Sequence, residues 1–246
     1  MKSTERHKLK ENAFAHSVAR ARDLMDTRRS DITRVAIAVV AVAVVVGGYS
    51  VWRQSRVTKA NSALAAGLAV YEAPVMTVAA PAPGSPLPVQ QAGTFATEQA
   101  KLEAALPKLM EAADKYPGTD SGIAARYYAA SALAALGRYP EAEQRFQEVV
   151  DKGGSKIYSR TAKLGVADAQ AAQGKFDSAI NIYRQMSADS NSAMPPDGVL
   201  MQLGRTCVRA GRKDEAARAF TRIVDEFPQS PYASDAKREL EETKKG

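Results

Sequence analysis

The sequence of 246 residues contains few of the side chains on which catalysis and metal binding depend. It has one cysteine, Cys207, which excludes a disulfide framework and a cysteine-based zinc site. Its two histidines are His7 and His16, so the chain after them has no histidine general base, Ser-His-Asp triad or HExxH zinc motif. A Gly-rich phosphate loop and a nucleophile elbow are also missing. We therefore expect a protein that is not an enzyme and has no metal or cofactor.

Aromatic residues are also few, at 7%, and much of the 45% hydrophobic content is Ala and Val. Small apolar side chains suit helices that stack closely better than a single thick core. The net charge of +7 divides into +4 over residues 1–34 and +3 over residues 53–246, where opposite charges are interspersed. This distribution is typical of a solvated surface, and we expect no nucleic-acid binding.

One long apolar run stands near the start of the chain. Residues 35–52, VAIAVVAVAVVVGGYSVW, carry no charge and are bracketed by Arg34 and Arg53. Eighteen helical residues span about 27 Å, close to the hydrocarbon core of a bilayer, whereas a buried strand needs far fewer. Tyr49 and Trp52 lie where aromatic rings favour the headgroup level. We expect a transmembrane helix; a cleaved signal peptide is the alternative, disfavoured by the long preceding segment and the poor cleavage site.

The arginines and lysines around this run predict its orientation. Three cations follow it within twenty residues, and five precede it: Arg20, Arg22, Arg28, Arg29 and Arg34. The excess favours a cytoplasmic N-terminus, with the C-terminal domain extracytoplasmic, in the periplasm of a Gram-negative host. We thus expect a single-pass protein of the inner (cell) membrane. The tail of residues 1–34 is either a short amphipathic helix on anionic lipid or a solvated tail that sets topology.

The C-terminal two-thirds of the chain repeats with a period of 37 residues, marked by Gly137, Gly174 and Gly211. Each glycine has a small residue seven positions before it, an alanine five after it and an aromatic nine after it. A repeat of this length is the signature of a stacked array of helix pairs. The recurring residues after the glycines are Ala142, Ala179 and Ala216, then Phe146, Tyr183 and Phe220.

Each of these positions has a physical role in a helix pair. The glycine ends the first helix in the left-handed conformation, and the alanine lies where the two helices approach closely. Asp177 and Asp214 are placed to cap the second helix, and Pro140 at the same offset suits its first turn. The aromatic residue closes the core between neighbouring repeats. The pattern predicts an all-α helical-repeat array.

These features resemble the tetratricopeptide repeat (TPR), in which the same small residue, alanine and aromatic recur and a proline often follows. Phe227-Pro228 and Tyr116-Pro117 match that proline. The longer period, against 34 in the family, implies extra residues in the turns. The resemblance implies a right-handed superhelix in which Cys207 is a small buried residue.

A degenerate first repeat precedes the clear ones. We expect a helix at residues 57–72, which continues or follows the apolar run, and a helix at 97–115 kinked at Pro107, joined by a proline-rich loop. A charged helix at residues 231–243 should cap the stack. The expected division is a tail at 1–34, a transmembrane helix at 35–52, a first repeat at 53–117 with the loop at 73–96, three repeats at 118–229 and a cap at 230–246.

The whole order, including ANSALAAGLAVYEAPV just after the apolar run, resembles the ancillary subunit family of the bacterial Sec translocon. That resemblance implies a membrane-anchored scaffold that holds translocon subunits and passes secreted proteins to periplasmic chaperones. Two alternatives remain: an envelope-assembly or cell-division scaffold of the same architecture, or an accessory domain of an enzyme. The repeats alone do not separate them, because fold does not fix function.

The TPR resemblance also implies a binding groove lined by the first helix of each repeat. We expect an apolar strip with two arginines at one end, suited to a protein segment that carries an acidic group. The alternative is that the Leu and Met are core residues and both arginines are solvated. The predicted groove residues are Tyr127, Ser131, Leu164, Asp168, Met201, Arg205 and Arg209.

Overall fold

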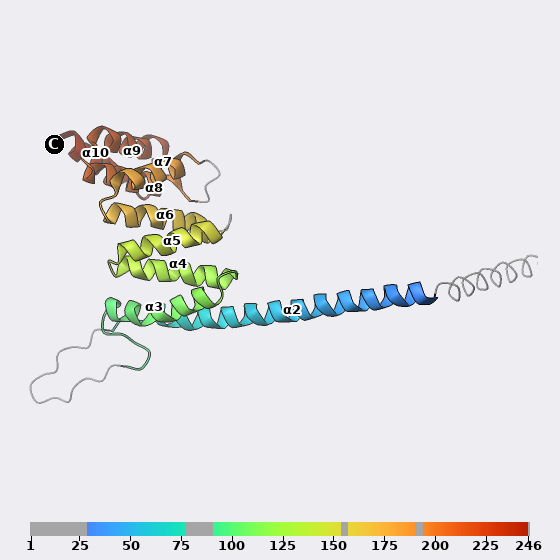
Figure 1. Cartoon of the computed structure of the whole chain (residues 1–246). Helices are drawn as coiled ribbons and strands as arrows, with labels where there is room; N and C mark the ends of the chain where they lie inside the picture. The colour runs from blue at the N-terminus through green and yellow to red at the C-terminus, as the bar shows by residue number, and fades with distance from the viewer. Residues whose placement is uncertain (1–28, 77–90, 154–156, 190–193, 246) are drawn as a thin grey trace, which may run out of the picture. The chain divides into compact units, whose positions relative to one another are not determined.

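The computed structural model of the protein describes residues 29–76, 91–153, 157–189 and 194–245. Within these ranges the regular elements are α-helices, apart from one isolated β-bridge between Val75 and Phe95 (Figure 1). The all-α prediction is therefore confirmed. His7, His16, most of the N-terminal tail and the centre of the proline-rich segment lie outside the described residues. The helices are α2 (Arg29–Tyr71), α3 (Glu98–Lys115), α4 (Asp120–Ala135), α5 (Tyr139–Lys152), α6 (Ile157–Ala172), α7 (Phe176–Ala188), α8 (Pro196–Arg209), α9 (Lys213–Glu226) and α10 (Ala233–Lys245).

The chain divides into two units, residues 1–55 and residues 56–246. In the first unit, the apolar part of α2 is a helix long and apolar enough to cross a membrane, and none of its apolar window is buried within the protein. Val44 and Val45, for example, are each 69% exposed. The Tyr49 and Trp52 rings lie 5.9 Å apart at the downstream end of this run.

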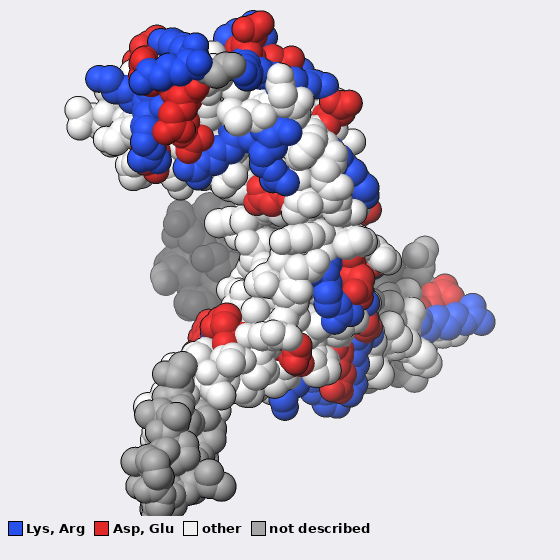
Figure 2. All heavy atoms as spheres, turned by 90° about the vertical axis from the view of Figure 1, so that its left-hand side faces the viewer, with Lys and Arg blue, Asp and Glu red and all other residues white. Residues whose placement is uncertain are grey.

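In the second unit each helix from α3 onward packs against the next one in the chain. In addition α4 contacts α6 and α6 contacts α8, whereas the alternate helices α5, α7 and α9 make no comparable contacts within the described residues. The stack therefore curves toward the row of α4, α6 and α8, which we call the inner row. Figure 2 shows one face of the molecule, on which charged residues crowd over the C-terminal helices and are sparse over the middle of the array.

The start of the array is formed by the C-terminal part of α2 and by α3. Residues 57–72 do not form a separate helix, because α2 continues to Tyr71, and Leu64 packs against the core that contains Leu109. Gly67 allows this approach, since a Cβ there would lie 2.6 Å from the Leu109 side chain. Helix α3 continues from Glu98 to Lys115 with Pro107 inside it.

The turn glycines have the predicted conformation. Gly137, Gly174 and Gly211 have φ angles of +74°, +78° and +74°, in the region that residues with a Cβ rarely adopt. The residue after each glycine donates its N–H to a carbonyl five positions earlier, as in Arg212 N to Cys207 O at 2.8 Å. This is the Schellman pattern, which satisfies carbonyls that the helix end leaves free.

The predicted capping role of Asp177 and Asp214 is wrong. The N-cap residues of α7 and α9 are Lys175 and Arg212, and neither side chain makes a capping hydrogen bond. The two aspartates instead lie inside the first turn, where a negative charge favours the helix dipole. Asp177 also forms an ion pair with Arg212, so these charges stabilise the helix start and join two turns.

The recurring alanines and aromatics form the core of the array. Ala142, Ala179 and Ala216 are fully buried. The three aromatics of the repeat are between 0% and 5% exposed. Phe220 packs against Gly204 of α8, where a Cβ would lie 2.3 Å from its ring. The small residue seven positions before the turn glycine therefore makes room for the aromatic of the next helix.

This contact makes Gly204 intolerant of even one methyl group. We expect Gly204→Ala to lower the free energy of unfolding by about 1–3 kcal/mol, because the buried Phe220 ring must shift. Gly198→Ala on the same helix is the matched control, since its Cβ would have its nearest contact at 3.4 Å and helix propensity favours Ala. Chemical denaturation of both variants measures the difference; equal stability would show that the Phe220 contact is not tight.

Candidate functional site

The predicted groove residues lie on the three helices of the inner row. Tyr127 and Ser131 are on α4, Leu164 and Asp168 on α6, and the remaining three on α8. One of them is not at the surface. Met201 is 1% exposed and belongs to the C-terminal core, so its predicted place in the groove is wrong. An unbranched apolar side chain fills such a gap in a core readily.

The two arginines predicted to receive an acidic group already have partners. Arg205 is exposed and forms an ion pair with Glu239 of α10, with Nη2 2.7 Å from Oε1. Arg209 donates from Nη2 to the carbonyl of Ala171 at 2.8 Å, and its guanidinium lies 5.2 Å from the Phe176 ring centroid. These contacts join α8 to α10, α6 and α7, so both side chains have structural roles.

The two α6 residues differ in their surroundings. Leu164 is half-buried against the C-terminal core. Asp168 lies at the surface, but its Oδ1 accepts a hydrogen bond from the hydroxyl of the buried Tyr183 at 2.6 Å. Desolvation raises the pKa of Asp168, and the bond from Tyr183 opposes that rise. This carboxylate therefore holds the phenol of the core and is poorly placed to bind a cation.

Four half-buried tyrosines form the main feature of the inner face, and we call them the tyrosine surface: Tyr71, Tyr127, Tyr128 and Tyr158. They come from the end of α2, from α4 and from the start of α6. Their ring centroids are 5.4 Å apart for Tyr127 and Tyr158 and 5.5 Å apart for Tyr71 and Tyr128. The Tyr71–Tyr128 pair meets edge-on, an arrangement that stabilises aromatic pairs beyond their buried area. The Phe146 ring packs against Tyr127, with the two ring centroids 5.8 Å apart.

The tyrosine surface is apolar with polar edges. Tyrosine phenols are protonated at neutral pH and can donate hydrogen bonds. Burial raises the pKa of Tyr71, Tyr127 and Tyr128 further. Half-exposed rings offer large, rigid contact area, and their hydroxyls offer donors to peptide carbonyls. Such a surface can bind an uncharged or weakly charged protein segment.

Sequence reasoning found Tyr127 and missed the other three tyrosines. Tyr128 and Tyr158 are not at the offsets from the turn glycine that mark the groove, and Tyr71 precedes the clear repeats. The signal available in the sequence was the clustering of tyrosines, because four of the nine fall on the first helices of three successive repeats. Only the stacking of α2, α4 and α6 brings them together.

Metal-binding and redox chemistry find no support in the described part of the chain. No group of three or more His, Cys, Asp or Glu residues there could hold a metal ion. Cys207 is fully buried, and burial raises the pKa of its thiol, which makes it less reactive.

Comparison with protein families decides the classification. The model of a tetratricopeptide repeat-like domain matches residues 31–197, and that of a tetratricopeptide repeat matches residues 170–240. The chain belongs to the tetratricopeptide repeat-like family. No curated protein matches it. Proteins of this family are in general non-catalytic scaffolds that bind other proteins.

Solved structures show the same fold at low identity. The chain is similar to the nearly identical TPR-like repeats of a Podosopora anserina protein described as a kinesin light chain, at 17% identity and a TM-score of 0.51. That match covers 59% of this chain and 79% of the other. A tetratricopeptide repeat protein from Parabacteroides merdae ATCC 43184 is 18% identical over 60% of this chain and 55% of the other, with a TM-score of 0.49.

Proposed function

We propose that this TPR-like protein is a membrane-anchored, non-catalytic scaffold that binds a segment of a partner protein on its tyrosine surface. The observation that carries the proposal is the tyrosine surface itself. Four neutral aromatic side chains from three helices lie together there, half-exposed on the inner face. The core needs aromatic bulk below this surface, at Phe146, but burial alone does not require phenols at its exposed edge.

The chemistry of the tyrosine surface defines the partner segment. Its side chains are aliphatic, aromatic or proline, because these pack on half-exposed rings without loss of hydration. Its backbone carbonyls accept hydrogen bonds from the phenols. A strongly acidic segment is disfavoured, since Arg205 and Arg209 are already engaged on the same row of helices.

The apolar part of α2 supports the anchoring half of the proposal. Its valines are about 60–70% exposed, an apolar area far above what an aqueous surface tolerates. In a bilayer, lipid covers such a surface, and the helix satisfies the hydrogen bonds of its own backbone. Five arginines before the run and three cations after it support a cytoplasmic N-terminus and an extracytoplasmic repeat domain.

The order of tail, apolar helix and repeat domain also supports a narrower role. We propose that the repeat domain stands beside the Sec translocon at the inner membrane and holds emerging proteins or periplasmic chaperones there. A nascent chain exposes apolar segments before it folds, which suits the chemistry of the tyrosine surface. This assignment rests on the likeness of architecture to the ancillary translocon subunit.

Affinity capture from detergent-solubilised membranes tests the binding surface. We expect Tyr128→Ser with Tyr158→Ser to reduce recovery of the specific partners at least tenfold, because two of the four rings are removed. Tyr232→Ser is the matched control, because Tyr232 lies outside the tyrosine surface and is 40% exposed. Circular dichroism should show an unchanged helix content in both. Equal recovery from wild type and the double variant would exclude the tyrosine surface as the site.

A further inference from the structure

An ion-pair cluster fills the gap between α3 and α5, at the first of the three clear repeats, which we number first, second and third. Arg126 of α4 is 2% exposed, and its Nε lies 2.9 Å from Glu148 Oε2 of α5. Arg145 of α5 reaches Asp114 of α3 at 3.0 Å and Glu148 at 3.4 Å. Two cations and two anions thus close the gap between α3 and α5 and balance one another's charge.

The same four positions recur 37 residues later, where Asp151 matches Asp114 and the other three side chains differ, and again 74 residues later, where all four differ. In the second repeat Lys163 takes the place of Arg126, and its Nζ contacts Gln185 Oε1 at 3.3 Å. In the third repeat the positions hold only one charge and three smaller or apolar residues. Asp114, Arg126, Arg145 and Glu148 correspond there to Ala188, Leu200, Ala219 and Arg222.

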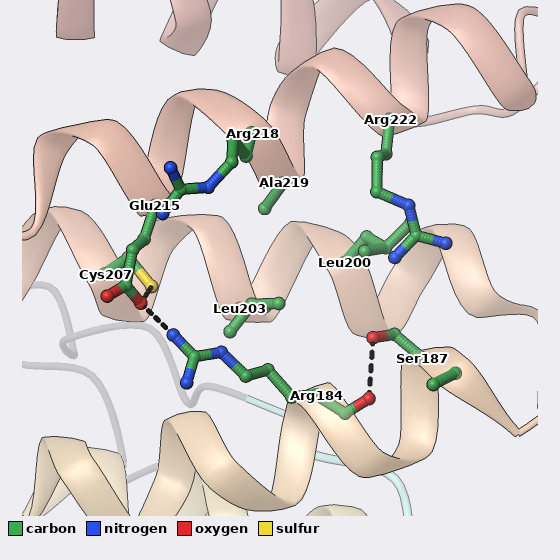
Figure 3. Close-up of a pocket in the computed structure, with 10 residues that line it drawn as sticks. Arg184, Ser187, Leu200, Leu203, Cys207, Glu215, Arg218, Ala219 and Arg222 are labelled. Atoms are coloured by element: carbon green, nitrogen blue, oxygen red, sulfur yellow. Dashed lines mark hydrogen bonds and ion pairs between the residues drawn. The ribbon is translucent and has the colours of Figure 1, made fainter.

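The substitutions leave a pocket of about 250 Å³ between α7, α8 and α9 (Figure 3). All four corresponding residues line it. Its floor is apolar and is formed by Leu200 and Leu203 of α8 and Ala219 of α9. Arginines of α7 and α9 stand around the opening. The pocket is lined by α7, α8 and α9, whereas the tyrosine surface is formed by α2, α4 and α6.

The charges around the pocket are not balanced as they are in the first repeat. Arg184 pairs with Glu215, and Arg222 pairs with Glu226 within its own helix, at 3.0 Å. Arg218 has no hydrogen-bonding or ion-pairing partner in the described part of the chain. Arg222 is held by Glu226, so Arg218 is the cation at this opening whose charge no described group pairs with. An anion beside Arg218 would supply that charge.

We propose that this pocket is a second protein-binding site, which takes an apolar side chain and an adjacent carboxylate from a partner protein. The apolar side chain packs on Leu200, Leu203 and Ala219. The carboxylate pairs with Arg218 at the opening and supplies a negative charge of the kind that Asp114 and Glu148 supply internally in the first repeat.

The size and charge of the pocket select this ligand class. Pockets that enclose drug-sized ligands or cofactors measure about 300–1,000 Å³, so this one suits one or two side chains. Arginine matches the planar geometry of a carboxylate, and hydrogen bonds between charged groups are roughly twice as strong as neutral ones. Cys207, which also lines the pocket, is fully buried with a raised thiol pKa and adds no charge.

Methyl NMR of the full chain in detergent micelles tests the site with an acetylated, amidated Leu-Glu dipeptide as the probe. We expect saturable shifts of the Leu200 and Leu203 methyl resonances, with affinity at least fivefold weaker for the Leu-Gln dipeptide. Acetate alone should not saturate these shifts at the same concentration. The proposal is wrong if the Leu-Glu dipeptide gives no saturable shift, or if Leu-Gln or acetate binds equally well.

Two sets of variants separate binding from folding. Arg218→Gln with Arg222→Gln should weaken the affinity for the Leu-Glu dipeptide at least fivefold. Arg160→Gln, which removes an exposed cation of α6, should leave that affinity unchanged. Leu200→Arg with Arg222→Glu rebuilds the first repeat's pair, fills the pocket and should abolish binding with the helix content retained. Unchanged affinity in the glutamine double variant would refute the proposal. That variant should still recover the partners of the tyrosine surface, so the two proposals fail independently.

Discussion

Replacing Val42 with Arg should release the protein from membranes. Val42 lies in the middle of the apolar run of α2 and is 62% exposed. An arginine at the centre of a spanning helix costs roughly 2.5–3.5 kcal/mol on insertion scales. The described part of the chain has one helix that could span a membrane, so no second span there offsets this cost. Carbonate extraction of membranes measures the result: the wild type should stay in the pellet and the variant should appear in the supernatant.

Val42→Leu is the matched control, because it changes the shape of the side chain and keeps it apolar. This variant should resist extraction as the wild type does. If Val42→Arg stays fully in the pellet, the anchor is not the apolar run of α2, and the membrane half of the proposed function is wrong. If the wild type itself is extracted, the protein is held by peripheral contacts.

Phe220→Ala should have the largest effect on stability, about 3–5 kcal/mol of the free energy of unfolding. The ring is fully buried between α8 and α9, and Gly204 cannot move to fill the space it would leave. Chemical denaturation followed by circular dichroism measures the loss. Phe220→Leu, which leaves a smaller cavity, should lose less. Unchanged unfolding of the alanine variant would show that this aromatic does not hold the repeats together.

The features of the fold that the sequence predicts are those with a local cause. A positive φ at Gly137, Gly174 and Gly211 requires a residue without a Cβ, so the turns could be placed from glycine spacing alone. The buried alanine and aromatic follow at fixed offsets because helix geometry fixes which face they occupy. The cap at Asp177 was misplaced because the N-cap is Lys175, two residues earlier, and helix ends are the least determined part of such a pattern.

The candidate site depends on contacts between helices, so the sequence predicted its residues less well than it predicted the fold. Arg205 is engaged by Glu239, which lies 34 residues later on α10, and no local pattern indicates that pair. Met201 and Tyr127 share the same offset from their turn glycines, yet one is buried and the other half-exposed. The difference arises from the surroundings: Met201 belongs to the C-terminal core, whereas Tyr127 has the rings of Tyr128, Tyr158 and Phe146 beside it and stays half-exposed.

Site-specific photo-cross-linking in intact cells tests the central claim most directly. A photoreactive phenylalanine at position 128 keeps an aromatic ring in the tyrosine surface, and the same residue at position 232 is the control. The scaffold account predicts protein adducts from position 128 that are absent or much weaker from position 232. Adducts of the same identity and yield from both positions, or none from position 128, would contradict the assignment of the tyrosine surface as the binding site.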